Sequence, residues 1–206
     1  MTRLRVDDLR QYSDVLRSRH GEAVTVRFVE PRDAEALQAY FRSLSGRSRY
    51  SRFLAAASEL PAVELECAIH IGEADRFSVV ATMQIEGRET IIGEARYAFD
   101  SETAAIEFGL SIDDRWQGHG IGKALLKNLE CRAAAFGAVQ VFGDTLRSND
   151  AMIALARKAG YVFTNTPGDW RLTRFRKDIL VEPREIPCAS WRLAALSPGA
   201  ISSLAV

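Results

Sequence analysis

A glycine-rich segment from Gln117 to Gly122, QGHGIG, constrains the fold of this chain more than any other feature. It follows a stretch of alternating residues that ends at Ile112 and precedes a helical pattern over residues 120–136. The start of a helix has unpaired N–H groups and a partial positive charge, and glycines let an anion approach the backbone closely. The segment therefore predicts a strand-to-helix turn that can bind a pyrophosphate, with Lys123 adding charge.

Other interpretations of these glycines have less support, although a plain tight turn stays open at this point. A dinucleotide-binding loop fits poorly because the spacing is not G-x-G-x-x-G and no pair of parallel strands with a ribose-binding acid surrounds it. The Walker sequence of P-loop proteins is absent. The order of the surrounding elements must decide between a turn and an anion site.

Strand and helix patterns alternate along most of the chain and predict a mixed α/β (α+β) domain. The strand-like runs at 77–85 and 90–99 are joined by a short turn, which predicts an antiparallel hairpin. Five helices are expected at 33–44, 47–57, 61–70, 120–136 and 149–159, with further strands at 24–29, 104–112, 139–145, 161–165 and 171–175.

The run over 104–112 alternates in a way that assigns a role to each face of the strand. Apolar side chains at every second position, Ile106, Phe108, Leu110 and Ile112, predict a core face. The intervening residues Glu107, Gly109 and Ser111 predict a face that meets a ligand.

The two ends of the chain are expected to differ from the central domain at 23–176. Leu9, Tyr12, Val15 and Leu16 recur at helical spacing, so residues 1–22 are expected to form an amphipathic helical extension. Periodicity fades beyond Arg176, where three prolines interrupt the sequence, and residues 177–206 form a tail whose structure the sequence leaves open.

Composition excludes several classes of function. The 206 residues carry 27 basic and 27 acidic side chains, so no net charge favours binding to nucleic acid or an anionic membrane. Cys67, Cys131 and Cys188 lack the C-x-x-C spacing of zinc or redox sites, and we expect reduced thiols and no metal. The first ten residues resemble neither a signal peptide nor a membrane anchor, and we expect a cytoplasmic protein.

Two spaced motifs resemble the GCN5-related N-acetyltransferase (GNAT) superfamily over roughly residues 24–175. Its signature R/Q-x-x-G-x-G/A is matched by Gln117, Gly120 and Gly122. Downstream, the segment from Asn149 to Tyr161 resembles N-x-x-A-x-x-L-Y-x-x-x-G-F. The resemblance implies a single domain with a mixed, mostly antiparallel, splayed sheet flanked by helices.

The same resemblance implies acetyl-CoA as co-substrate. The end of the strand at Leu110, Ser111 and Ile112 would pair with the pantetheine arm, and Asn149 would lie near that arm or cap the next helix. The loop amides would hold the pyrophosphate, contributed by Gln117, Gly118, His119, Gly120, Ile121, Gly122 and Lys123.

Glu107 is the candidate catalytic base, because it lies on the strand that leads to the loop and could deprotonate an amine directly or through water. The stretch from Glu107 to Gln117 resembles bacterial Pat-type protein-lysine acetyltransferases, in which a glutamate at this offset is the base. Glu94 and His119 are the alternative titratable groups. The tyrosine that many members use as a general acid is replaced by Ala156, so no general acid can be assigned.

Three functions remain open on the sequence alone. The first is an N-acetyltransferase in which a primary amine, from a protein lysine or a small molecule, attacks acetyl-CoA directly in a ternary complex. The second is a non-catalytic acyl-CoA-binding sensor or regulatory module. The third is an interaction module that uses the N-terminal segment and the tail. The acceptor and the choice between monomer and homodimer are not fixed by sequence.

Overall fold

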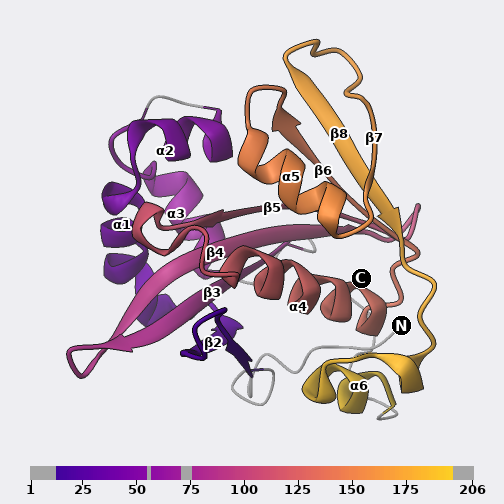
Figure 1. Cartoon of the computed structure of the whole chain (residues 1–206), viewed down its shortest axis with the longest axis horizontal. Coiled ribbons are helices and arrows are strands. Elements are labelled where there is room, and N and C mark those ends of the chain that lie inside the picture. Colours follow the sequence, from indigo (N-terminus) through magenta and orange to yellow (C-terminus); the bar gives the residue numbers. More distant parts are fainter. Residues whose placement is uncertain (1–12, 55–56, 71–75, 197–206) are drawn as a thin grey trace.

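The computed structural model describes residues 13–54, 57–70 and 76–196. In this part of the chain, an eight-stranded sheet has the order β1-β2-β3-β4-β5-β6-β8-β7, with helices on both faces (Figure 1). The strands are β1 (Asp14–Arg17), β2 (Ala23–Phe28), β3 (Arg76–Ile85), β4 (Arg88–Asp100), β5 (Ala105–Ile112), β6 (Gln140–Leu146), β7 (Val162–Asn165) and β8 (Leu172–Asp178). The helices are α1 (Ala34–Ser43), α2 (Gly46–Phe53), α3 (Ala62–Ile69), α4 (Ile121–Ala135), α5 (Asp150–Lys158) and α6 (Ala189–Leu196).

The expected hairpin of β3 and β4 is confirmed, and its antiparallel register extends from Arg76 opposite Ala98 to Ile85 opposite Arg88. The mixed sheet contains one parallel pair among the described strands, β5 and β6. That pairing covers only three positions and ends where Glu107 lies opposite Phe142. Beyond this point the pairing stops, and the edge of β5 from Leu110 onward lines a cavity and is open to a ligand.

Two apolar cores hold the helices on opposite faces of the sheet. On one face, α4 and α6 pack against the central strands through fully buried residues such as Leu125, Ile106 and Trp191. On the other face, a smaller core joins α1 and α3 to Val80 and Ile91. The expected apolar side of the central strand at Ile106 and its alternating neighbours is confirmed as part of the larger core.

The expectation of an N-terminal helix is wrong for residues 14–17, which form the edge strand β1 and pair with β2. Val15 and Leu16 alternate in exposure, as strand residues do, because antiparallel pairing to β2 decides their conformation. Leu9 and Tyr12 lie outside the described residues.

The C-terminal segment, whose structure the sequence leaves open, is described as far as residue 196. β8 continues to Asp178, and α6 inserts Trp191, which is 0% exposed, under the sheet. The indole N–H of Trp191 donates to Asp14 at 3.0 Å. Cys188 forms a disulfide with Cys131 of α4, so the expectation of three reduced thiols is wrong for this pair. No described helix is long and apolar enough to cross a membrane.

Candidate functional site

A cavity of about 820 Å³ opens where β5 leaves β6. The last residues of β5, Leu110 to Ile112, form one wall, and α5 forms the wall opposite. One end is closed by Gln117, Gly118 and Gly120 of the loop before α4 and by Gly122 and Lys123 of its first turn. The predicted loop and the predicted strand edge therefore meet at one cavity.

The loop directs the N-terminus of α4 into this cavity. Gly118 and Gly120 have φ values of +80° and +82°, a region in which a side chain is strained. Gly120 caps α4, which has 15 residues, so the unpaired N–H groups of its first turn face the cavity. The side chain of Gln117 donates to the carbonyl of Ile112 at 3.1 Å and ties the loop to the end of β5.

Four exposed cations surround the cavity: Arg19, Arg47, Lys123 and Lys158. None of them has an ion-pair partner in the described part of the chain. Such a set suits a ligand with several phosphate charges. Of the four, only Lys123 was predicted from the sequence, because the other three reach the cavity from separate elements through tertiary packing.

Of the remaining residues predicted to bind the cofactor, some line the cavity and others do not. Asn149 lines the cavity and also caps α5, since its side-chain oxygen accepts the N–H of Met152 at 3.2 Å. Ser111 lines the cavity, but its hydroxyl is buried against Tyr40 at 2.9 Å and its backbone pairs with Glu94 of β4. His119 and Ile121 do not line the cavity: the ring of His119 contacts Trp116, and Ile121 is in the core.

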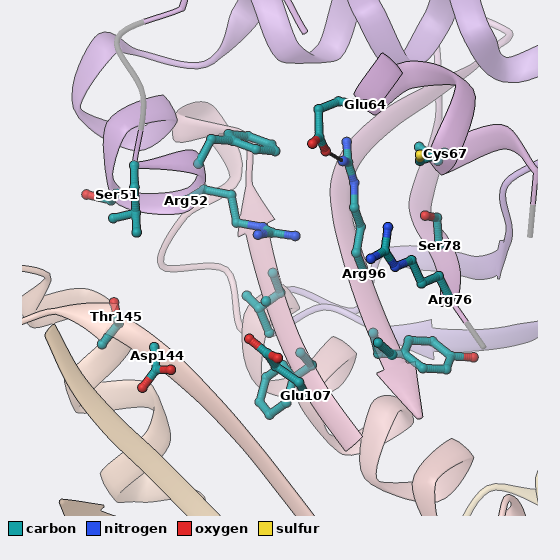
Figure 2. Close-up of a pocket in the computed structure, with 18 of the residues that line it drawn as sticks. Ser51, Arg52, Glu64, Cys67, Arg76, Ser78, Arg96, Glu107, Asp144 and Thr145 are labelled. Carbon is teal, nitrogen blue, oxygen red and sulfur yellow. Dashed lines mark hydrogen bonds and ion pairs between the residues drawn. The ribbon is translucent and has the colours of Figure 1, made fainter. Parts of the chain in front are cut away.

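A second cavity of about 570 Å³ lies on the same side of the divergence. Its floor is formed by β3, β4 and β5, and its walls by α2, α3 and β6 (Figure 2). The two cavities have five lining residues in common, Ser51, Arg52, Leu110, Asn149 and Met152. The two cavities therefore meet beside the end of β5.

Glu107 projects into the second cavity at the position where the pairing of β5 with β6 ends. Its carboxylate has no hydrogen-bond or ion-pair partner in the described ranges, and it attracts Arg174 of β8 only from a longer distance. Asp144 of β6 lies across the gap (Figure 2) and is bound by both Arg174, at 2.7 Å, and Thr166, at 2.8 Å. Burial acts to raise the pKa of Asp144, but these hydrogen bonds outweigh it and hold the pKa below its usual range. Asp144 thus stays ionised and engaged, whereas Glu107 is available.

Glu94, an alternative base in the sequence, is only 2% exposed and is bound on both sides. Arg52 donates to it at 2.9 Å and Arg96 approaches it at 3.2 Å. Both arginines engage this buried carboxylate, whereas that of Glu107 is unpaired among the described residues, so Glu107 is the better candidate. Ala156, at the position of the family tyrosine, is completely buried and presents no proton donor.

The chain matches the acetyltransferase (GNAT) family model over residues 35–161, more than half of its length. It is 28% identical over 149 residues to "Acetyltransferase PA5475" of Pseudomonas aeruginosa, covering 72% of this chain and 80% of that protein.

Solved structures agree with this match. The GNAT domain of S. lividans PAT aligns with a TM-score of 0.73 and 27% identity over 81% of this chain and 97% of that one. RimL, a ribosomal L7/L12 α-N-protein acetyltransferase solved with coenzyme A, aligns with a TM-score of 0.63 and 15% identity over 76% and 94%. The splayed sheet, the glycine loop at the start of α4 and these matches lead to one conclusion: the chain belongs to the GNAT acetyltransferase family.

Proposed function

We propose that this acetyltransferase moves an acetyl group from acetyl-CoA to a primary amine, from a protein lysine or a small molecule, by direct attack in a ternary complex. The observation that carries the proposal is the meeting of the two cavities at the divergence of β5 and β6, with Glu107 beside the junction. One cavity has the glycine loop and cations that suit the phosphates of acetyl-CoA. The other holds the unpaired carboxylate.

Glu107 is proposed to be the base. An alkyl amine has a pKa near ~10.4, so its deprotonation at pH 7 costs about 4 to 5 kcal/mol unless the site helps. Glu107 would attract the ammonium ion and take its proton, directly or through one water molecule. The amine nitrogen then attacks the thioester carbonyl, and backbone N–H groups stabilise the oxyanion.

The departing thiolate has no tyrosine donor at Ala156. A thiol with a pKa near ~8.5 is a fair leaving group, and the proton removed from the amine can neutralise it through water. A mechanism with Glu107 as the base is therefore compatible with alanine at position 156.

The test measures release of CoA thiol from acetyl-CoA with a panel of amines and lysine peptides. Glu107→Gln should lower kcat by about 100-fold or more while leaving acetyl-CoA affinity unchanged. Glu102→Gln, which makes the same change on the exposed turn after β4, should behave as wild type. Binding of acetyl-CoA without release from any acceptor would instead favour the sensor interpretation, and equal rates in wild type and Glu107→Gln would remove Glu107 as the base.

A further inference from the structure

The floor of the second cavity, here called the acceptor cavity, consists of side chains in register across three strands. Arg76 of β3 lies opposite Ala98 of β4, and Ala98 lies opposite Glu107 of β5. Residues paired in this way project from the same face of a sheet. All three line the acceptor cavity, so Arg76 and Glu107 lie at opposite sides of one floor.

The other charges that line this cavity are already compensated. Arg52 and Arg96 share Glu94, and Arg96 also binds Glu64 at 3.1 Å. Asp144 is held by Arg174, as described above. Arg76 and Glu107, by contrast, have no hydrogen-bond or ion-pair partner within residues 13–54, 57–70 and 76–196. The acceptor cavity thus keeps one cation and one anion for a ligand.

The distance between these charges limits what can bridge them. Neighbouring strands lie about 4.8 Å apart, which places the backbones of Arg76 and Glu107 about 10 Å apart. Between them Ala98 offers only a methyl group, so the floor is open. Figure 2 shows the guanidinium of Arg76 extended over this floor toward Arg96 and Arg52.

Arg52 adds donors to the same side of the cavity. Its Nε is used by Glu94, but no described residue accepts from its two terminal nitrogens. The side chain is 17% exposed and packs over the ring of Phe53 at 5.0 Å, which fixes its orientation. Arginine forks bind carboxylates in a bidentate manner.

From this arrangement we propose that the acceptor carries a carboxylate a few bonds from its amine. Glu107 binds the amine, and Arg76, assisted by Arg52, binds the carboxylate. The inference rests on the proposed acetyl transfer and narrows its acceptor to amines of the ω-amino-acid type, either free or as a lysine beside an acidic residue in a peptide. A simple alkylamine or a polyamine would leave Arg76 unpaired.

The test compares kcat/KM for matched acceptors, 6-aminohexanoate against its neutral amide and a lysine peptide with glutamate against the same peptide with glutamine. Wild type should prefer the acid by about ten- to a hundredfold in at least one pair, and the pair that shows the preference identifies the source of the carboxylate. Arg76→Ala should reduce that ratio to about one, and Arg76→Glu should favour 1,5-diaminopentane over 6-aminohexanoate. Arg88→Ala, the same kind of change at the exposed start of β4, should keep the wild-type ratio.

Two results would overturn the inference in different ways. Equal turnover of acid and amide by wild type, or a preference that survives Arg76→Ala, would refute the carboxylate site and leave acetyl transfer intact. Absence of CoA release with every amine would refute the proposed function and the inference together.

Discussion

Replacing Gly120 by alanine should weaken acetyl-CoA binding because the loop needs a left-handed residue at this position. Gly120 has φ +82°, and a methyl group there would also lie 3.4 Å from Arg19. Holding a non-glycine residue in this region costs about 1 to 2 kcal/mol, which corresponds to an affinity loss of roughly 5- to 30-fold if the free loop relaxes to another conformation. The alanine would then have to adopt the left-handed conformation only in the ligand-bound state, so the cost would reduce the affinity.

Gly122→Ala provides the matched control. Gly122 lies in the first turn of α4 without a positive φ, and a methyl group there would make an ordinary contact with Leu155 at 3.5 Å. Isothermal titration calorimetry with acetyl-CoA should show weaker binding for Gly120→Ala and a Kd within about twofold of wild type for Gly122→Ala. Equal losses in the two variants, or wild-type affinity in Gly120→Ala, would refute the role given to the left-handed turn.

Three further predictions concern other positions. Gly109→Ala would place a methyl group 2.7 Å from the Nη1 atom of Arg52, so kcat/KM for the acceptor should fall while acetyl-CoA affinity, measured by calorimetry, stays close to wild type. Asp33→Asn breaks a buried ion pair with Arg27 at 2.6 Å and should lower the free energy of unfolding by about 3 kcal/mol at pH 7. Burial acts to raise the pKa of Asp33, but its hydrogen bonds outweigh burial and lower that pKa. Denaturant titrations should therefore show the stability difference between wild type and Asp33→Asn at neutral pH, and should show it disappear as the pH falls through the folded-state pKa. A stability difference that grew in acid would contradict an ionised Asp33 in the folded protein. Cys67 is exposed in the acceptor cavity, yet direct attack predicts that Cys67→Ser keeps full activity and that intact-mass measurements on wild type with acetyl-CoA alone show no acetyl adduct.

The sequence predicts the centre of the fold well because its signals there are local. Alternation over 104–112 and the glycines before residue 120 each report on neighbouring residues, and the structure has the expected strand, turn and helix in that order. The edge strand β1 could not be predicted in this way, since Val15 and Leu16 fit helical and strand spacing equally over so short a segment. Pairing with β2 decides between them.

The residues of the acceptor cavity are harder to predict from the sequence than those of the cavity beside the glycine loop. Arg76, Ala98 and Glu107 share one row of the sheet only because of the register of two antiparallel pairs, which no local pattern reports. The disulfide between Cys131 and Cys188 likewise joins residues 57 positions apart. Glu107 can be proposed from the sequence because its strand leads to a recognisable loop, whereas the arginines around it belong to distant segments.

The most direct test of acetyl transfer with Glu107 as the base is mass-spectrometric detection of the N-acetylated amine. Its formation from acetyl-CoA is compared between wild type and Glu107→Gln, with acetyl-CoA binding measured on the same samples. We predict that wild type forms the acetylated acceptor and that Glu107→Gln binds acetyl-CoA with wild-type affinity but forms about 100-fold less product per unit time. Acetyl-CoA binding by both proteins with no acetylated amine from wild type, or equal product from the two, would contradict acetyl transfer with Glu107 as the base.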